Sequence, residues 1–389
     1  MEQKYKMFFA LISSQFTQHK LSEQNKRVCS QEIIHEFLEL AKKHDILHLL
    51  ALGLKENDLL SLCPKDTRNA IFKAVYRYER LNLDFTFLCD FFEKENISFV
   101  PLKGSMIRNY YPEPWMRTSG DVDILVHEDD LTHITEALTK NFDYEFITKD
   151  SHVVMFRTPR NVYIELHYNL LEECDEHNGW DSLLNVWNAV TVRKGLEYFY
   201  EMPDDLFYFY HIAHMAKHFE NGGCGIRPFI DLWILDRIDS ADMDRRDGLL
   251  QEGRLFTFAN VARRLSRVWF DGEEHDAITQ RMEAYILSGG VYGNSTNRIM
   301  VQQQQKGGRI KYALSKIFIP YDVIKFQYPI LQKHRWLTPI MEARRWCRLI
   351  FCGHLKRTAK ELKYNIRLSS NDAADTQNFL RDIGLWSKN

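Results

Sequence analysis

Two aspartates, Asp121 and Asp123, stand one residue apart in the apolar run DVDILV. Alternate side chains of a strand share a face, so we expect both carboxylates on one face, with Val122 and Ile124 pointing into the core. Two carboxylates this close repel each other and raise one another's pKa unless a cation lies between them. Magnesium is such a cation, because it takes oxygen ligands and keeps open positions for water and phosphate. The pattern therefore predicts a metal site at this strand.

A third carboxylate stands in a later run of alternating apolar and polar residues, VYIELHYNL. Tyr163, Glu165 and His167 form one face of this expected strand. If the strand pairs beside DVDIL, Glu165 joins Asp121 and Asp123, and three such carboxylates suit a two-metal site for nucleotidyl transfer. Taken alone, an acidic pair is a weak signal that often marks a solvated strand end, and Glu165 has the alternative of being an exposed strand residue.

A phosphate cradle is expected upstream, in the Gly104-Ser105 turn that precedes a short helix. Glycine lets the backbone come close to a ligand, and the N–H groups at a helix N-terminus bind anions. Lys103 and Arg117 flank this turn and are expected to neutralise phosphate charge. Ser105 has a plain structural alternative as the N-cap of the short helix, and that role is compatible with phosphate contact.

A small sheet is needed to position these residues. Strands are predicted for ISFVPLKG, which ends in a tight turn, and for TSGDVDILV. Helices are predicted for SMIRNYYP and for HEDDLTHITEALTKNF. A hairpin is predicted for HVVMFRTPRNVYIELHYNL, because Pro159 and Asn161 supply turn residues between its two alternating runs.

Helical periodicity surrounds this stretch on both sides, beginning with an amphipathic run that has Ser30 as its expected N-cap. We predict an α+β fold in which a small mixed sheet is flanked by N-terminal helices and a helical C-terminal domain. The expected regions are an N-terminal helical region at 1–90, an α/β core at 91–200, a helical domain lining the cleft at 201–300, and a basic helical region at 301–389.

The order of strand, Gly-Ser, short helix, Asp-x-Asp strand and later Glu-containing strand resembles the DNA polymerase β-type nucleotidyltransferase superfamily. More narrowly, LKGSMIRNYYPEPWMRTSGDVDILV is similar to the pattern LKG…YP-x-P…R…D-x-D-x-LV of the bacterial uncharacterised nucleotidyltransferase family. Three later segments, HMAKHF, IRPFIDLWIL and YPILQKHRWLTPIMEARRW, resemble helical and C-terminal segments of that family. The resemblance covers about 95–350, and 1–90 only loosely.

The resemblance implies a polymerase β-like core and assigns individual residues. It implies Gly104 and Ser105 for phosphate, Asp121 and Asp123 for metal, and Glu165 as the third acid. Further residues are implied to line the nucleotide cleft without individual roles: Lys103, Arg117, Lys217, His218, Arg227 and Asp231. The chain departs from the best-known superfamily members in the longer interval between Ser105 and Asp121, which YPEPWMR fills.

His211, His214 and His218 share one face of an expected helix and invite comparison with a zinc site. The typical helical zinc pair at i and i+4 is accompanied by an acidic base that this segment lacks, so we favour buried or cleft-lining histidines. Arg227 and Asp231 lie one helical turn apart. An ion pair within the helix and a place in the cleft both account for them.

Composition limits the class of protein. The 389 residues are 45% hydrophobic and 27% charged, as in ordinary soluble proteins, and their length predicts two or three packed units. Apolar runs are too short for a bilayer span, and the N-terminus lacks a secretory signal. The seven cysteines are scattered without a CxxC pair, which favours reduced thiols over disulfides or structural zinc. We therefore expect a cytoplasmic protein without stable membrane insertion.

The net charge of −2 conceals an asymmetry. Residues 301–370 hold 15 Lys and Arg against 3 Asp and Glu, a local charge of +12, whereas residues 1–300 carry −13. With Trp336, Trp346 and Tyr328, the basic segment suits nucleic-acid binding by charge and stacking. Docking on anionic lipid is a second interpretation, and packing against the acidic remainder of the chain, the one we favour, is a third.

Together these observations predict an enzyme that transfers a nucleoside monophosphate from an NTP, such as ATP, to an acceptor hydroxyl with release of pyrophosphate. Two Mg²⁺ ions are the expected cofactors, with Mn²⁺ as the alternative ion, and the base of the NTP is left open. The acceptor also stays open among small molecules, protein hydroxyls and RNA. The alternatives are a catalytically idle nucleotide-binding module and a basic RNA-docking protein on a nucleotidyltransferase scaffold.

Overall fold

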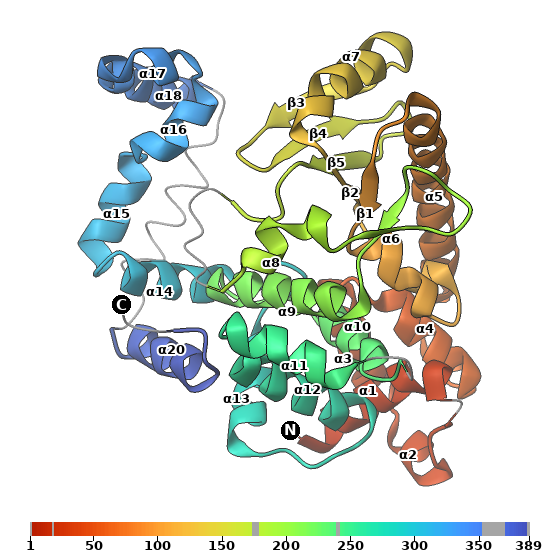
Figure 1. Ribbon diagram of the computed structural model, residues 1–389. Coiled ribbons are helices and arrows are strands. Elements are labelled where there is room, and N and C mark those ends of the chain that lie inside the picture. Colours follow the sequence, from red (N-terminus) through yellow and green to blue (C-terminus); the bar gives the residue numbers. More distant parts are fainter. Residues whose placement is uncertain (1, 18, 173–178, 239–241, 352–369, 387–389) are drawn as a thin grey trace.

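The computed structural model describes residues 2–17, 19–172, 179–238, 242–351 and 370–386 (Figure 1). Within these ranges the chain has an α+β architecture: a small mixed sheet is joined to a larger helical body, and further helices extend beyond that body.

The sheet has five strands in the order β1-β2-β5-β4-β3. Their bounds are Phe99–Pro101 for β1, Asp121–Val126 for β2, Glu145–Lys149 for β3, Val153–Arg157 for β4 and Tyr163–His167 for β5. β2 and β5 are parallel, and the other neighbours are antiparallel. The expected pairing of the Asp-x-Asp strand with the Glu165 strand is therefore confirmed.

The register of β2 against β5 places Asp123 opposite Glu165 and Asp121 opposite Tyr163. The expected hairpin of β4 and β5 is present, and its turn contains Asn161 with a left-handed φ of 60°. The edge strand β3 was not predicted. Its five residues are all exposed, so it lacks the alternation by which a half-buried strand is recognised in sequence.

The two faces of the sheet meet different neighbours. Val122, Ile124 and Ile164 are buried with Phe92 in a core that α5 (Asn69–Glu95) and α7 (Leu131–Asn141) complete. On β2, Leu125 instead joins the core of the helical body. The aspartates share the face of Leu125 because strand side chains alternate, so the sheet directs its acidic residues toward the helices.

The helical body combines segments far apart in the sequence. Its large apolar core includes residues from α1 (Glu2–Thr17), α4 (Leu47–Glu56), α9 (Asp204–Glu220), α10 (Arg227–Leu235) and α12 (Phe256–Phe270). Phe9 of α1, for example, stacks on Trp269 of α12 with ring centroids 4.3 Å apart. The remaining helices of the body are α2 (Glu23–Val28), α3 (Gln31–Lys43), α8 (Asp181–Leu184), α11 (Met243–Glu252) and α13 (Ala277–Ser288).

Ser30 caps α3 as expected, because its hydroxyl accepts a hydrogen bond from the backbone N–H of Ile33 at 3.3 Å. A minor hairpin, β6 (Thr191–Val192) with β7 (Tyr200–Glu201), lies between the sheet and α9 in the chain. The four regional boundaries predicted from the sequence stay a prediction, since the core of the helical body draws on both the N-terminal helices and those after residue 200.

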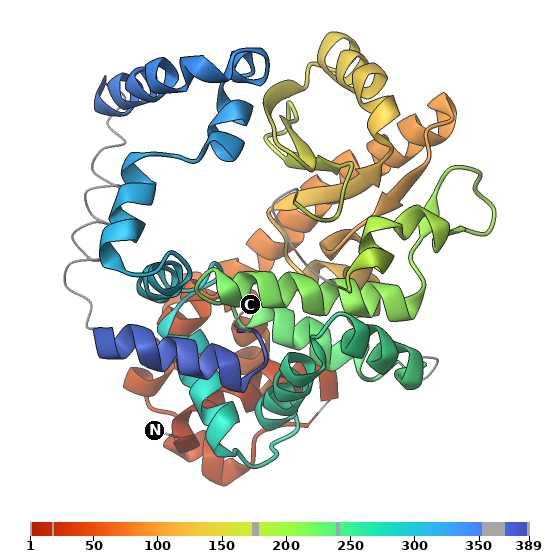
Figure 2. The ribbon, with the colours of Figure 1, turned by 60° about the vertical axis from the view of Figure 1, so that its left-hand side comes forward.

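A series of helices extends away from the body (Figures 1 and 2). It consists of α14 (Ser295–Gln305), α15 (Arg309–Ile317), α16 (Tyr321–Gln327), α17 (Ile330–Lys333) and α18 (Thr338–Phe351). The final helix, α20 (Ser370–Asp382), packs back against α14.

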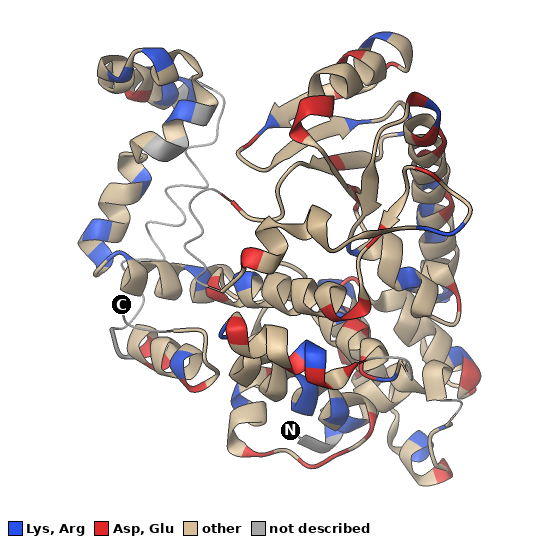
Figure 3. Ribbon diagram, viewed as in Figure 1, with Lys and Arg blue, Asp and Glu red and all other residues tan. Residues whose placement is uncertain are grey.

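Basic side chains recur along α15 to α18 (Figure 3), and Trp336 is 72% exposed there. None of the helices in the described ranges is long and apolar enough to cross a bilayer. Part of the basic segment predicted from the sequence, 352–369, lies outside the described residues.

Candidate active site

Three side chains on β2 and β5 converge at the end of the sheet nearest the helices. Asp123, Glu165 and His167 each offer one ligand atom, and these atoms all lie within 4.8 Å of one another. His167 Nε2 lies 3.1 Å from Asp123 Oδ1 and 3.4 Å from Glu165 Oε2. An ionised carboxylate only accepts hydrogen bonds, so in this arrangement Nε2 carries the hydrogen and donates it.

Lys103 provides the positive charge at this cluster. Its Nζ donates to Asp123 Oδ1 at 2.7 Å, and its backbone has a left-handed φ of 43° immediately before α6 (Gly104–Ile107). Burial opposes ionisation of Asp123, but Lys103 and His167 together lower the pKa of this carboxyl well below its usual value. Asp123 and Lys103 are therefore a charged pair, and Asp123 is 4% exposed.

Asp121 has a different electrostatic environment. Burial, followed by the neighbouring charges of Asp123 and Glu165, raises the pKa of Asp121 to about 6. Burial is the larger cause, and the contribution of the two neighbouring carboxylates is the repulsion expected in such a cluster, which a bound cation would relieve. Asp121 lies outside the three-residue cluster but lines the same cavity as Asp123 and Glu165.

The Gly104 turn borders the same cavity and is tightly packed. A Cβ at Gly104 would lie 3.2 Å from Cβ of Ser119, which leaves no room for a larger residue without movement. Arg108 fixes the turn by donating to the Gly104 carbonyl at 2.6 Å and to Ser119 Oγ at 3.0 Å. Ser105, expected beside phosphate, is buried at the base of the turn, and the side chain lining the cavity here is that of Ser119.

Arg117, which lines the smaller cavity, has a buried carboxylate partner. Its guanidinium donates to both carboxylate oxygens of Asp231, with Nε at 2.8 and 3.0 Å and Nη2 at 2.8 Å. Tyr111 donates to the same carboxylate at 2.6 Å. Asp231 is fully buried, so Arg117 is needed to balance its charge. The ion pair of Asp231 thus runs to Arg117 and not, as one interpretation had it, to Arg227 within the helix.

Arg227 connects the loop before β2 with the N-terminal helices. Its Nη1 donates to the carbonyl of Thr118 at 2.8 Å and lies 3.5 Å from Asp45 Oδ2. Both Arg227 and Asp231 line the cavity that contains Asp121 and Asp123. Of the two alternatives predicted for Arg227 and Asp231, the position in the cleft agrees with the structure, and the ion pair between them within the helix does not.

The histidines of α9 are partly buried in the walls of the cavities, where their neutral form is favoured. His211 bonds the carbonyl oxygen of Pro228 at 3.0 Å, and burial is the main cause that lowers the pKa of His211, His214 and His218. Among the described residues, the group close enough to share an ion is the one with Asp123, and the α9 histidines are not in it. All three histidines line the smaller cavity, and His214 and His218 also line the larger one.

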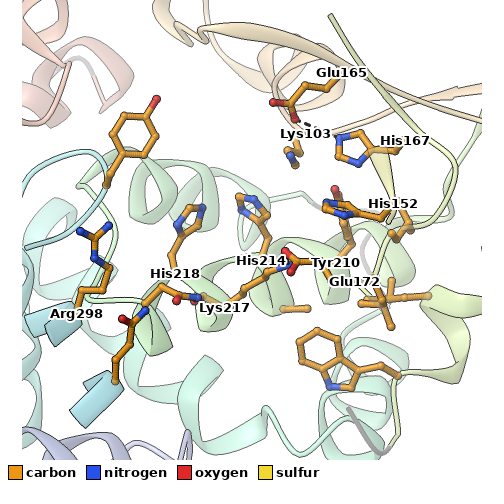
Figure 4. Close-up of a pocket in the computed structure, with 18 residues that line it drawn as sticks. Lys103, His152, Glu165, His167, Glu172, Tyr210, His214, Lys217, His218 and Arg298 are labelled. Atoms are coloured by element: carbon orange, nitrogen blue, oxygen red, sulfur yellow. Dashed lines mark hydrogen bonds and ion pairs between the residues drawn. The ribbon is translucent and has the colours of Figure 1, made fainter. Parts of the chain in front are cut away.

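Two cavities meet at the cluster. The smaller, about 270 Å³, is lined by Gly104, Asp121, Asp123 and Arg227 among others, and the larger, about 490 Å³, extends past His167 and Lys217. Both are bordered by a shared set of side chains: Lys103, Glu165, Tyr210, His214, His218 and Tyr292. Figure 4 shows His214 and His218 side by side on α9, pointing toward the part of the larger cavity that Glu165 and Lys103 border.

Lys217 belongs to the larger cavity, where its ammonium forms an ion pair with Glu172. The cleft residues expected from the resemblance are therefore divided. Gly104, Arg117, Arg227 and Asp231 border the smaller cavity, Lys217 borders the larger one, and Lys103 and His218 border both.

The donor set fits a hard divalent cation. Carboxylates on neighbouring strands supply oxygen ligands, and the ammonium of Lys103 lies where positive charge is required. Burial, and after it repulsion from Asp123 and Glu165, raises the pKa of Asp121. Asp121, Asp123 and Glu165 would hold such ions, with His167 orienting two of these carboxylates.

Sequence reasoning did not assign several residues of the site. His167 was placed on the face of Glu165 without a role, and its spacing from Glu165 was the available signal. Ser119 precedes the Asp-x-Asp strand by two residues but looks like an ordinary loop serine. Tyr210 and Arg77 lie on helices and Asp45 in the turn after α3, and the packing of these elements against the site has no signature in the sequence.

The fold and the site define an α+β nucleotidyltransferase. The chain matches the model of the family described as uncharacterised nucleotidyltransferase over residues 30–271, which is more than half its length, and it belongs to that family. No curated protein and no solved structure matches the chain.

Proposed function

We propose that this protein transfers a nucleoside monophosphate from an NTP to an acceptor hydroxyl, with Mg²⁺ as cofactor and pyrophosphate as the second product. The observation that carries the proposal is the direct pairing of Asp123 with Glu165 across β2 and β5, beside the Gly104 turn. Paired carboxylates next to a glycine turn supply the ligands for ions and the room for phosphates that nucleotidyl transfer requires.

The triphosphate lies in the smaller cavity. Gly104 lets the backbone approach closely, and Ser119 presents a hydroxyl beside it. Arg227, which bonds the carbonyl of Thr118, adds positive charge, while Arg117 stays bound to Asp231 and positions the loop before β2. Bound divalent ions supply a lowered pKa for the attacking hydroxyl and neutralise charge on the leaving pyrophosphate.

The acceptor enters from the larger cavity. Glu165 borders both cavities, so its carboxylate lies where an acceptor and the α-phosphate meet. Leu170, Leu171 and Trp180 give this cavity an apolar wall, and Lys217 with Glu172 gives it a charged one. A volume of about 490 Å³ is in the range of sites for small molecules.

The proposal is tested by offering each NTP in two labelled forms, one at the α-phosphate and one at the γ-phosphate, with Mg²⁺ and fractionated lysate. Nucleotidyl transfer places the α-label on an acceptor and releases the γ-label as pyrophosphate. Transfer of the γ-label alone would mean a kinase reaction and contradict the proposal. Binding of NTP without release of either label would support the idle nucleotide-binding module.

A second candidate function concerns the basic helices α15 to α18. Ile310, Phe318 and Trp336 are exposed there among Lys and Arg residues, which suits stacking on a single-stranded nucleic acid. This function predicts RNA binding that weakens steeply with salt and is unchanged by Asp121→Ala. Salt-independent binding, or a loss of binding in Asp121→Ala, would exclude it.

A further inference from the structure

One carboxylate oxygen at the smaller cavity is shared by two arginines from different helices. Asp45 Oδ2 lies 2.9 Å from Arg77 Nη1 of α5 and 3.5 Å from Arg227 Nη1 of α10. Asp45 is the second residue after the end of α3 and has a left-handed φ of 56°. Two guanidiniums that converge on a single oxygen match the way in which arginines bind a phosphate oxygen.

This arginine pair stands beside the expected path of the triphosphate. A Cβ built at Gly120 would lie 3.7 Å from Arg77 Nη2, so Arg77 reaches the residue that precedes Asp121. Arg227 bonds the carbonyl of Thr118 in the same loop. Asp45, Arg77 and Arg227 all line the cavity that contains the Gly104 turn and Asp121.

The surroundings hold polar groups that the protein itself leaves without hydrogen-bond partners. His44 is fully buried and lines the cavity, and both of its ring nitrogens lack a partner among the described residues. Nε of Arg227 is also buried and has no hydrogen-bond partner among the described residues. Buried polar groups without partners are costly, so the polar groups around Arg227 are incompletely satisfied by the described residues themselves.

We propose that Arg77 and Arg227 bind the terminal phosphates of the nucleotide, and that Asp45 occupies this arginine pair when no nucleotide is bound. The inference rests on the proposed function, since it assigns a polyphosphate to the same cavity. It makes the N-terminal helices part of the nucleotide site, through one residue after α3 and one on α5.

Asp45 is suited to be displaced. Its side chain is 40% exposed, so its ion pairs are weaker than buried ones, and it leaves the pair by a movement toward solvent. A terminal phosphate carries more negative charge and more acceptor oxygens than a carboxylate, and therefore competes well for two guanidiniums. Arg227 also lies near Arg117, and burial together with that neighbour lowers the pKa of Arg227, which makes an added anion favourable.

The test measures binding of inorganic tripolyphosphate by calorimetry, in EDTA and at one fixed salt concentration, so that bound metal does not contribute. Asp45→Asn removes the internal competitor and is expected to tighten binding roughly fivefold. Arg77→Gln is expected to weaken binding on the order of tenfold, and Arg77→Lys to recover part of that loss. Arg227→Gln is expected to weaken binding in the same way.

A matched control comes from Arg237 and Asp271, an ion pair that lines neither cavity. Asp271→Asn and Arg237→Gln are expected to leave tripolyphosphate binding at the wild-type value. The inference fails if Asp45→Asn binds tripolyphosphate no more tightly than wild type, or if Arg77→Gln binds it as tightly as wild type. Asp45 would then be a permanent ion-pair partner that connects α5 and α10. Arg77 and Asp45 are both partly exposed, so these variants decide the matter even if Arg227→Gln does not fold.

Failure of this inference is distinguishable from failure of the proposed function. Wild-type affinity in the Asp45 and Arg77 variants, together with α-label transfer by the wild-type protein, removes the arginine site alone. The expected changes in tripolyphosphate binding without any α-label transfer keep the arginine site and remove the transferase.

Discussion

The ammonium of Lys103 lies 2.7 Å from Oδ1 of Asp123, so the carboxylate at the centre of the site is already paired with a positive charge. Lys103 is held there by an unusual left-handed backbone conformation and by the turn that follows it. A divalent ion that binds Asp123 therefore competes with this ammonium.

Lys103→Met is expected to raise the affinity for Mn²⁺ several-fold in the absence of nucleotide, because the competing charge is removed. The fraction of free Mn²⁺, followed by electron paramagnetic resonance, measures this affinity. Lys140→Met, at an exposed position on α7, is the matched control and should bind Mn²⁺ as the wild type does. Weaker Mn²⁺ binding in Lys103→Met would show that the lysine supports the metal site and does not compete with it.

His167 positions the metal ligands through its hydrogen bond to Asp123 and its proximity to Glu165. Substitution of such outer partners lowers metal affinity by roughly tenfold to a hundredfold. We expect His167→Ala to show a loss of this size in Mn²⁺ binding, and His167→Gln, which keeps a donor, to recover part of it. Equal losses in both variants, with an intact fold by circular dichroism, would mean that the imidazole acts in another way.

The buried pair of Arg117 and Asp231 should contribute strongly to stability. Asp231→Ala leaves Arg117 without its partner in the interior, and we expect the free energy of unfolding to fall by about 3–5 kcal/mol. Denaturant unfolding monitored by tryptophan fluorescence measures the change. The double variant Arg117→Met, Asp231→Leu should be much less destabilised than the sum of its single changes. Additive losses would argue against the pair.

Stability should also depend on the histidines buried in neutral form. Burial lowers the pKa of His48 from 6.5 to about 4, so between these pH values the unfolded chain binds more protons than the folded one. The contribution of His48 is complete above pH 6.5 and is lost as the pH falls toward 4, by roughly 2–3 kcal/mol at pH 4.5.

His48→Gln tests this dependence because it keeps a donor for the Met116 carbonyl, which His48 Nε2 contacts at 2.8 Å, but does not titrate. The free energy of unfolding, measured from pH 7 to 4.5, should fall less steeply in this variant than in the wild type. An unchanged slope would mean that His48 titrates normally.

The strands of the candidate site, β2 and β5, were predictable from the sequence because strand periodicity and register act locally. Asp123 and Glu165 lie in short alternating runs, and one pairing of these runs brings them together. Ser30 and Asn161 were likewise recognised from local capping and turn chemistry.

Other parts of the site depend on tertiary packing. Arg117 was expected beside phosphate, but its partner Asp231 lies 114 residues away and is brought to it only by the packing of α10. Arg77 belongs to α5 and Asp45 to the turn after α3. The amphipathic pattern of these helices predicts a core face but says nothing of the few polar residues that reach the cavity. Ser119 is recognised as part of the site only in the structure, where the Gly104 turn packs against it.

The central claim is that the carboxylates of β2 and β5 carry out nucleotidyl transfer, and the ratio of pyrophosphate released to α-label transferred tests it most directly. The wild-type protein with Mg²⁺ should give one pyrophosphate per label transferred. Asp123→Asn should give neither product while keeping the wild-type circular dichroism spectrum. Full transfer by a correctly folded Asp123→Asn protein would contradict the claim.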